Sequence, residues 1–171
     1  MFREVFRDKR QIMTLEQNEE ILTKAKAGIL SVHGDDGYPY GVPLNFVYAN
    51  NKLYFHCMPE HGHKLDAIKR DPKVSFSIIY KDDVVKEEYT SYFQSVIVFG
   101  RARIVEDVEE KIAMHEILVK KYMPELWEGC YEIFKDRIAW MGVIEVEIDH
   151  ISGKQAIELA VPGFVLEELR K

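Results

Sequence analysis

Cysteine, basic charge and long apolar runs are scarce in this sequence, and each scarcity excludes a class of protein. The two cysteines, Cys57 and Cys130, cannot build a disulfide framework and suit a reducing compartment. The 29 acidic residues outnumber the 23 basic ones, and the net charge of −6 disfavours a nucleic-acid surface. The longest apolar run, 138–144, is far shorter than the ~20 residues of a membrane helix, and the charged start 1–11 has no signal-peptide pattern. We expect a soluble, cytoplasmic protein that binds neither nucleic acid nor membrane.

The fingerprints of common nucleotide-binding and hydrolytic enzymes are also missing. The sequence has no G-x-G-x-x-G motif, no P-loop and no G-x-S-x-G elbow. His115 and Glu116 begin like the zinc-protease motif H-E-x-x-H, but Val119 stands where the second histidine belongs. We therefore interpret His115 as a residue on a helix flank. Glu145 and Glu147 share one face of a predicted strand, and we expect both to be solvated.

The hydrophobic patterning predicts a single domain over residues 1–171, with a core at about 10–157 and a C-terminal tail at 158–171. A capping box at Thr14 and Gln17 begins a helix that Gly28 would stop. A polar loop is expected at 81–91 and a bulge at Gly100. Further helices are predicted at 63–70, 107–122 and 125–137, and strands at 29–33, 38–48, 53–58, 73–80, 95–105 and 140–149. This order predicts a small antiparallel β-barrel, mainly β, with inserted helices.

The segment YGVPLNF (40–46) is unusual for a strand because it carries glycine and proline. With Pro39 and Pro43 unable to donate to a ladder, the strand is expected at a sheet edge or at a bulge. Two interpretations remain open. The prolines protect an edge against aggregation, or the free backbone groups bind the rim of a flat heterocycle.

The stretch FHCMPEHGHK (55–64) has the residue types of a metal site, with His56, Cys57, His61 and His63 close together. A structural zinc ion needs four converging ligands. Side chains alternate along a strand, so His56 and Cys57 should lie on opposite faces. We therefore predict no metal site and expect His61 to be a solvated loop residue.

Gly62, His63 and Lys64 stand where a loop gives way to a helix. The first N–H groups of a helix favour an anion, Gly62 permits close approach of the backbone, Lys64 adds a charge and His63 can donate a hydrogen bond. These residues are interpreted either as a phosphate-binding turn or as a solvated helix cap.

Four motifs in this order resemble a known family: GYPYGVPLNFVYANNKLYFHC (37–57), GHKLDAIKRDPKVSF (62–76), SVIVFGRARIV (95–105) and VIEVEIDHISGKQ (143–155). They resemble the flavin-binding split β-barrel proteins, more narrowly the branch related to pyridoxamine 5′-phosphate oxidase and the 5-nitroimidazole reductases. The resemblance implies a six-stranded antiparallel split barrel that forms a homodimer, with FMN at two sites between the subunits. FAD is the alternative flavin.

The resemblance also implies which residues contact the cofactor. One strand would run beside the flavin ring, the next would contact ring and ribityl chain, and the turn at 62–64 would bind phosphate. Gln94 and Ser95 would approach from the partner subunit. The implied set is Pro43, Leu44, Asn45, Phe46, Phe55, His56, Cys57, Gly62, His63, Lys64, Gln94, Ser95 and Trp140.

The implied function is an oxidoreductase that passes electrons from reduced flavin to a small organic acceptor such as a nitroaromatic, with NAD(P)H as a donor. The leaner phosphate site and the C-terminal segment without a late-arginine motif argue against pyridoxamine phosphate oxidation. His56 is the candidate proton donor, or else only shapes the pocket. Two other functions stay open: a non-catalytic module that stores flavin, and a haem-binding relative with His56 or His63 as axial ligand.

Overall fold

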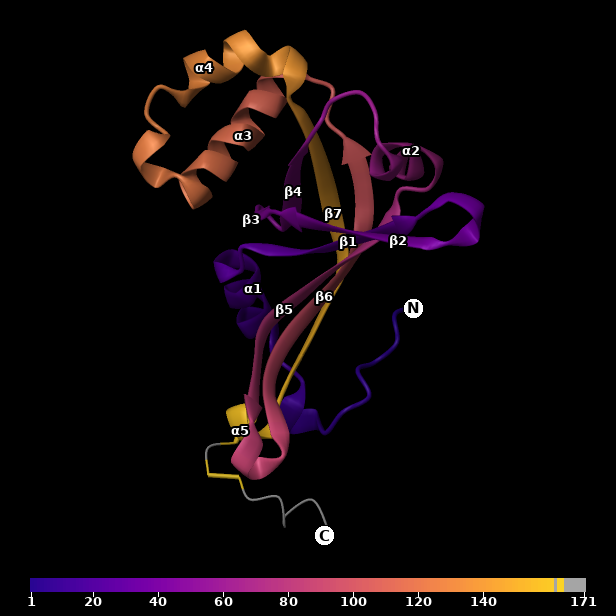
Figure 1. The fold of residues 1–171 in the computed structure, drawn as a ribbon, viewed down its shortest axis with the longest axis vertical. Coiled ribbons are helices and arrows are strands. Elements are labelled where there is room, and N and C mark those ends of the chain that lie inside the picture. Colours follow the sequence, from indigo (N-terminus) through magenta and orange to yellow (C-terminus); the bar gives the residue numbers. More distant parts are fainter. Residues whose placement is uncertain (162, 165–171) are drawn as a thin grey trace.

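The computed structural model describes residues 1–161, 163 and 164, and its centre is one strongly bent antiparallel sheet (Figure 1). Its seven strands lie in the order β2-β1-β5-β6-β7-β4-β3. They are β1 (Ala27–His33), β2 (Pro39–Asn45), β3 (Val47–Ala49), β4 (Lys52–Cys57), β5 (Lys73–Val85), β6 (Thr90–Ile104) and β7 (Gly142–Gln155).

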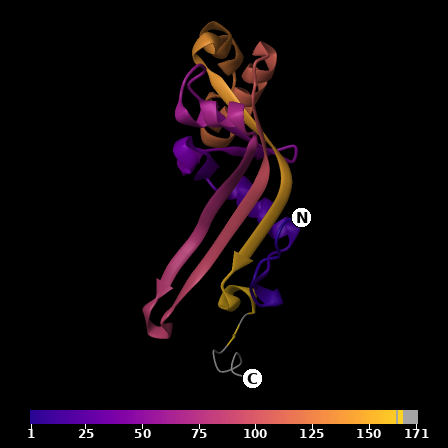
Figure 2. The ribbon, with the colours of Figure 1, turned by 90° about the vertical axis from the view of Figure 1, so that its right-hand side faces the viewer.

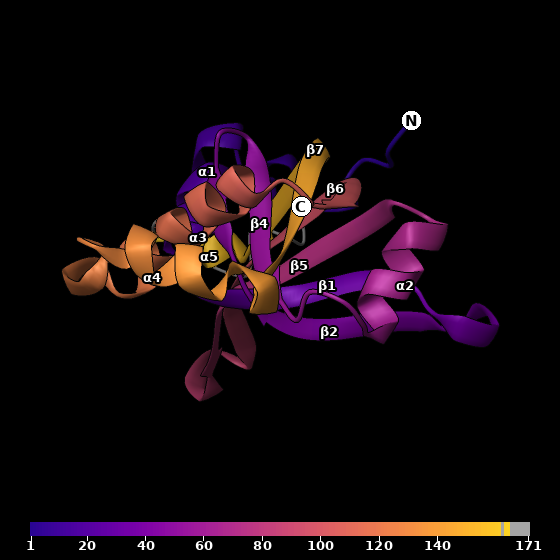
Figure 3. The same ribbon diagram turned by 90° about the horizontal axis from the view of Figure 1, so that it is seen from above.

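Helices lie around this sheet, and Figure 3 shows α3 and α4 on one side and α2 on another. They are α1 (Leu15–Lys24), α2 (His63–Arg70), α3 (Val108–Tyr122), α4 (Cys130–Arg137) and α5 (Ile157–Ala160). Among the described residues no helix is long and apolar enough to cross a membrane. Residues 158–160 of the predicted tail belong to α5, and most of the rest of that tail lies outside the described residues.

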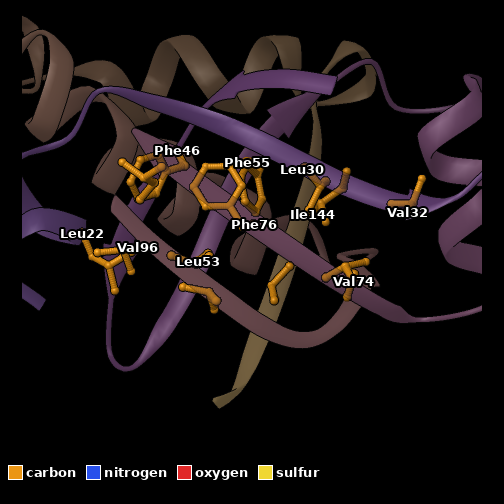
Figure 4. Close-up of a cluster of buried hydrophobic side chains, with 14 of the residues drawn as sticks. Leu22, Leu30, Val32, Phe46, Leu53, Phe55, Val74, Phe76, Val96 and Ile144 are labelled. Atoms are coloured by element: carbon orange, nitrogen blue, oxygen red, sulfur yellow. The ribbon is translucent and has the colours of Figure 1, made fainter. Parts of the chain in front are cut away.

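The core fills the inside of the bent sheet. Phe46, Phe55 and Phe76 are fully buried, and the Phe76 ring lies 4.7 Å from the Phe46 ring and 5.0 Å from the Phe55 ring (Figure 4). Both contacts are edge-to-face, the arrangement that aromatic quadrupoles favour. Gly28 lies in β1 beside this cluster, where a Cβ would come within 2.5 Å of the Phe76 ring. Gly28 therefore serves packing; the prediction that it stops a helix is wrong, because α1 already ends at Lys24.

The predicted strand 38–48 is two strands, which makes the sheet seven-stranded instead of six-stranded. β2 and β3 lie at opposite edges of the sheet, and Phe46 alone connects them. The chain therefore crosses the gap at which the bent sheet fails to close. The physical reason for the division is that the Phe46 side chain enters the core. As predicted from its prolines, β2 is an edge strand.

The end of α3 closes this gap through hydrogen bonds to Phe46. The Phe46 N–H donates to the Tyr122 hydroxyl oxygen at 3.0 Å, and the Lys121 amine donates to the Phe46 carbonyl at 3.1 Å. The same amine donates to the carbonyl of Ala25 at 2.7 Å, and burial lowers the pKa of Lys121 to about 8. Backbone groups that would otherwise lack a partner at the split are therefore satisfied by side chains of one helix.

The loop predicted at 81–91 is instead the far part of a long hairpin. β5 and β6 pair through Val85 and Thr90 and extend well beyond the barrel (Figure 2). The polar composition of 81–91 suggested a loop because both faces of this arm meet solvent. Its strands pair through their main chains, and neither face needs to be apolar. β7 likewise continues to Gln155, past the predicted end at 149, because β6 offers it a partner. The expected bulge at Gly100 and the capping box at Thr14 are both confirmed.

We expect Tyr122→Phe to destabilise the fold by about 1–3 kcal/mol, because it leaves the buried Phe46 N–H without its acceptor. Urea denaturation measures this, with Tyr131→Phe as the matched control, since the Tyr131 hydroxyl bonds only to Glu109 at the surface. Equal effects of the two substitutions would show that the split does not depend on this bond.

Candidate functional site

A cavity of about 310 Å³ lies at the split, between the end of β2, β4 and the helices α3 and α4. Asn45 ends β2, and His56 stands one residue before the end of β4. The lining residues are Asn45, His56, His115, Leu118, Val119, Tyr122, Met123 and Phe134. The bond between Tyr122 and Phe46 that closes the barrel therefore also forms part of the cavity wall.

The alternation predicted for His56 and Cys57 is confirmed. His56 lines the cavity on the side of α3, whereas Cys57 packs against the hydrophobic core. Burial raises the pKa of the Cys57 thiol, against a smaller opposite effect of Lys64 and Lys111, so this thiol is a weak nucleophile. Among the described residues no group of three or more His, Cys, Asp or Glu side chains could hold a metal ion.

Asn45 and His56 are the only lining residues in the predicted set, and His115 is the missed residue with titratable chemistry: it is buried and does not lie on a solvated flank. Its Nδ1 lies 2.8 Å from the Lys111 carbonyl oxygen, one turn earlier in α3. Burial lowers the pKa of His115, which keeps the ring neutral at pH 7. Nδ1 is then the donor to Lys111, and Nε2 is left as an acceptor. The available signal was periodicity, because His115 falls on the same helical face as Ile112 and Val119.

The predicted helix start at Gly62 is confirmed, with α2 running over His63–Arg70 and Gly62 at φ 143°. The His63 ring stacks on Tyr40 at 4.1 Å, and its Nε2 accepts a hydrogen bond from the Asp35 N–H at 3.1 Å. Nδ1 is therefore the nitrogen that remains to donate. Lys64 is half-buried and lies near enough to Cys57 to lower the pKa of that thiol. The start of α2 and the cavity thus flank the same end of β4.

Some of the remaining predicted residues lie near the cavity, and others lie far from it. Pro43 and Leu44 lie on the edge strand, and Trp140, 75% exposed, precedes β7 beside the end of β4. Phe46 and Phe55 are core residues, so only their backbone could reach a ligand. Their predicted role remains a prediction.

Gln94 and Ser95 lie far from the cavity within one chain. His56 pairs with Val143, whereas Ser95 pairs with Lys154 at the other end of β7. The stretch of β7 between these partners spans roughly 35 Å at ~3.3 Å per residue. Gln94 donates from its amide to Gln155 at 3.1 Å. A contribution of these two residues to the cavity region therefore requires a second chain.

The expectation that Glu145 is solvated is wrong, whereas Glu147 is exposed. The Glu145 carboxylate accepts hydrogen bonds from Arg103 at 2.8 Å and Lys52 at 3.0 Å, and Arg103 also pairs with Glu110 of α3. Burial raises the pKa of Glu145, but these two cations outweigh it and hold the pKa below its usual range. The pattern failed here because α3 covers this face of β7.

The bent sheet and the cavity together define a split-barrel protein whose cavity at the split is covered by helices. The chain belongs to the pyridoxamine 5′-phosphate oxidase family, whose family model matches residues 14–155. The family is one of flavin-binding proteins, which confirms the resemblance drawn from the four motifs.

Two proteins are similar to this chain in sequence, and a third shares its fold. An uncharacterised protein of Rhizobium meliloti (strain 1021) is 30% identical over 156 residues, covering 85% of this chain and 95% of that protein. A proposed 5-nitroimidazole antibiotic resistance protein of Bacteroides thetaiotaomicron is 26% identical with a TM-score of 0.73, covering 84% and 86% of the two chains. The FAD and haem binding protein of Mycobacterium smegmatis, 17% identical, shares the fold with a TM-score of 0.73 over 95% of this chain and 80% of its own.

We expect Glu145→Gln to destabilise the protein by about 1–3 kcal/mol at pH 7, because Arg103 and Lys52 lose their charged partner. The folded-state pKa of Glu145 is lowered, so its contribution is complete above its ordinary value of 4.5 and declines as the pH falls below it. Denaturation at several pH values should show the gap between wild type and variant closing under acid conditions. Glu147→Gln, on an exposed residue of the same strand, is the control; a gap independent of pH would contradict the assignment.

Proposed function

We propose that the protein is a homodimeric flavoprotein oxidoreductase of the cytoplasm that passes electrons from reduced FMN, or FAD, to a small organic acceptor such as a nitroaromatic. The observation that carries the proposal is the position of His56. It lies at an apolar cavity, while the opposite side of the same strand end faces the half-buried Lys64 at the start of α2. NAD(P)H is the proposed electron donor.

The residues around the end of β4 suit a flavin phosphate. Helical hydrogen bonding in α2 begins with the N–H groups of Leu65 and Asp66, which both bind the Gly62 carbonyl. The N–H groups of His63 and Lys64 precede that ladder and carry the partial positive charge of a helix start. Lys64 adds a full charge, and Gly62, with φ 143° and ψ 145°, has open space where a Cβ would stand, which an anion could approach. Together these donors favour phosphate over a neutral group.

The edge strand β2 suits the flat ring. Its outward positions alternate Pro39, Gly41, Pro43 and Asn45, a low surface with no bulky side chain before Asn45. A bound flavin would supply electrons as a hydride, and its flat ring would offer a surface for the acceptor. The backbone of β2 would orient the rim of that ring, as the free edge of a sheet offers donors and acceptors.

A second copy of the chain would complete the site. The outer face of β1, β5 and β6 carries Ile29, Ile97 and Phe99, each more than a third exposed, set among small serines such as Ser77. An apolar, low-relief face of this kind favours a two-fold interface. Within such a dimer, the arm of one subunit could bring Gln94 and Ser95 to the other subunit's flavin.

His56 is the proposed proton donor. Hydride addition to a neutral acceptor leaves an anion, and a proton from the His56 imidazolium would neutralise it; the ring would then regain a proton from solvent. An imidazole suits this exchange because it changes charge near neutral pH. Tyr122 cannot replace it, since its hydroxyl lies 2.6 Å from both the Lys26 and Phe46 carbonyls.

Lys64→Ala should weaken flavin binding roughly 10- to 150-fold through loss of a charge-assisted phosphate contact. Fluorescence titration of the flavin-free protein measures the dissociation constant. The matched control is Lys69→Ala in the last turn of the same helix, which should bind flavin like wild type. Equal flavin affinities of the two variants would contradict the assignment of the phosphate to the start of α2.

His56→Gln should retain flavin but slow its reoxidation by a nitroaromatic roughly 100-fold or more, the usual contribution of a positioned general acid. Stopped-flow absorbance follows the reaction. His61→Gln serves as control, because the His61 side chain is 91% exposed and should not affect the rate. An unchanged rate of flavin reoxidation in His56→Gln would show that His56 only lines the cavity and donates no proton.

A further inference from the structure

We propose that a second cavity, of about 400 Å³ between the segment before α1 and the strand β7, binds a flat nitrogen heterocycle with an amino group at its edge, as adenine has. The observation that carries the proposal is the state of Asn18. This residue lines the cavity and is 3% exposed, and its Oδ1 has no hydrogen-bond partner among the described residues. The inference does not depend on the proposed function, which gives this cavity no role.

The cavity lies beside a stretch of β7 that β4 leaves unpaired. β4 pairs with β7 over Gly142–Glu147, and beyond that stretch the chain before α1 runs along β7 instead (Figure 2). The Met13 N–H donates to the Gly153 carbonyl at 3.0 Å, and Ile12 forms a β-bridge with Lys154. The segment that precedes these contacts encloses the cavity against β7.

Within one chain, this cavity lies far from the cavity at the split. His56 pairs with Val143 near the start of β7, whereas Ser152 lines the second cavity. The stretch of β7 from Val143 to Ser152 spans roughly 30 Å at ~3.3 Å per residue. A ligand in the second cavity therefore leaves the cavity at the split of the same chain open.

The unpaired oxygen of Asn18 lowers the stability of the free protein, and a ligand would remove that cost. A buried acceptor without a donor loses its hydration and gains nothing in return. Gly153 makes room for this oxygen, because a Cβ at position 153 would come within 1.8 Å of it. An amino group would supply the missing donor. Carboxamide side chains suit adenine in particular, since its amino group and ring nitrogen match the acceptor and donor of the amide.

Two of the residues that line the cavity contribute aromatic rings. Phe2 stacks on His150, with centroids 4.7 Å apart and an interplanar angle of 6°. Phe99 extends the stack at 5.2 Å from Phe2. Flat bases bind such platforms by stacking, because every base has a π face. The aromatic wall therefore favours a flat ring over a branched aliphatic molecule.

The charged groups at the cavity do not determine the class of ligand. Its titratable lining residues are Arg3, Glu4, Lys9 and His150, and the first three are exposed and carry charges of both signs. Solvent and salt screen such charges. A neutral nucleoside is therefore the suitable probe, because its binding depends on the hydrogen bond and the ring stack.

The first test compares adenosine with purine riboside, which lacks only the amino group, in calorimetric titrations of the protein as purified. Adenosine should bind at least about fivefold more tightly, because its amino group supplies the donor that the Asn18 oxygen lacks. Equal binding of the two nucleosides, or binding of neither, would overturn the inference.

Asn18→Leu, a substitution of similar size, removes the unpaired oxygen. Adenosine affinity should fall at least about fivefold, while the Tm of the free protein should stay the same or rise, because that oxygen has no partner to lose. Glu16→Leu, at an exposed position of the same helix, is the control and should bind adenosine like wild type. A lower Tm for Asn18→Leu would show that the amide serves the fold, and the inference would fail.

A second pair of variants tests the aromatic wall. Phe2 is 45% exposed, so the fold should tolerate Phe2→Ala, and adenosine affinity should fall at least about fivefold. Phe6→Ala is the matched control, because Phe6 lies on the same segment, is fully exposed and does not line the cavity. Equal affinities of these two variants would contradict the stacking.

Flavin content, measured by absorbance in the same samples, distinguishes this site from the proposed flavin site. Asn18→Leu and Phe2→Ala should hold as much flavin as wild type. A loss of flavin together with adenosine binding would assign the cavity to the flavin and overturn the inference. Adenosine binding that depends on Asn18 in a protein that takes up no flavin would support this site and refute the proposed function.

Discussion

The backbone of Phe46 is the point on which the rest of the structure depends. At this residue the chain leaves one edge of the bent sheet and joins the other, so its N–H and carbonyl have no strand to pair with. Tyr122 and Lys121 supply the missing partners from α3. Lys121 forms no ion pair with a carboxylate of the described residues, and burial lowers its pKa to about 8. The closure of the barrel and the placement of α3 are therefore one interaction.

The same closure creates the site. Once α3 lies across the split, the alternation of β4 assigns its last residues to different surroundings: His56 to the cavity and Cys57 to the core. The turn that follows β4 leads directly into α2 and brings Lys64 to the opposite side of the strand end. Under the proposed function, His56 and Lys64 would therefore contact the bound molecules from opposite sides of the same strand end.

Local chemistry predicted much of this from sequence. The prolines of β2 place it at an edge, Gly100 marks a bulge, and strand periodicity separates His56 from Cys57, because each depends on a residue's own backbone or its immediate neighbours. What sequence reasoning missed depends on distant partners. Phe46 divides a continuous β pattern because its side chain enters the core while a side chain of α3 accepts its N–H. Glu145 is buried under α3, with Arg103 and Lys52 as charged partners. Residues 81–91 looked like a loop because their pairing involves the main chain alone. The family itself was visible in four ordered motifs.

The absorbance spectrum of the protein purified without added cofactor tests the central claim most directly. We expect the two visible absorption bands of a flavin, and fluorescence of the released chromophore after denaturation. A colourless protein that takes up no added FMN or FAD would contradict it, and so would a haem Soret band in place of the flavin bands.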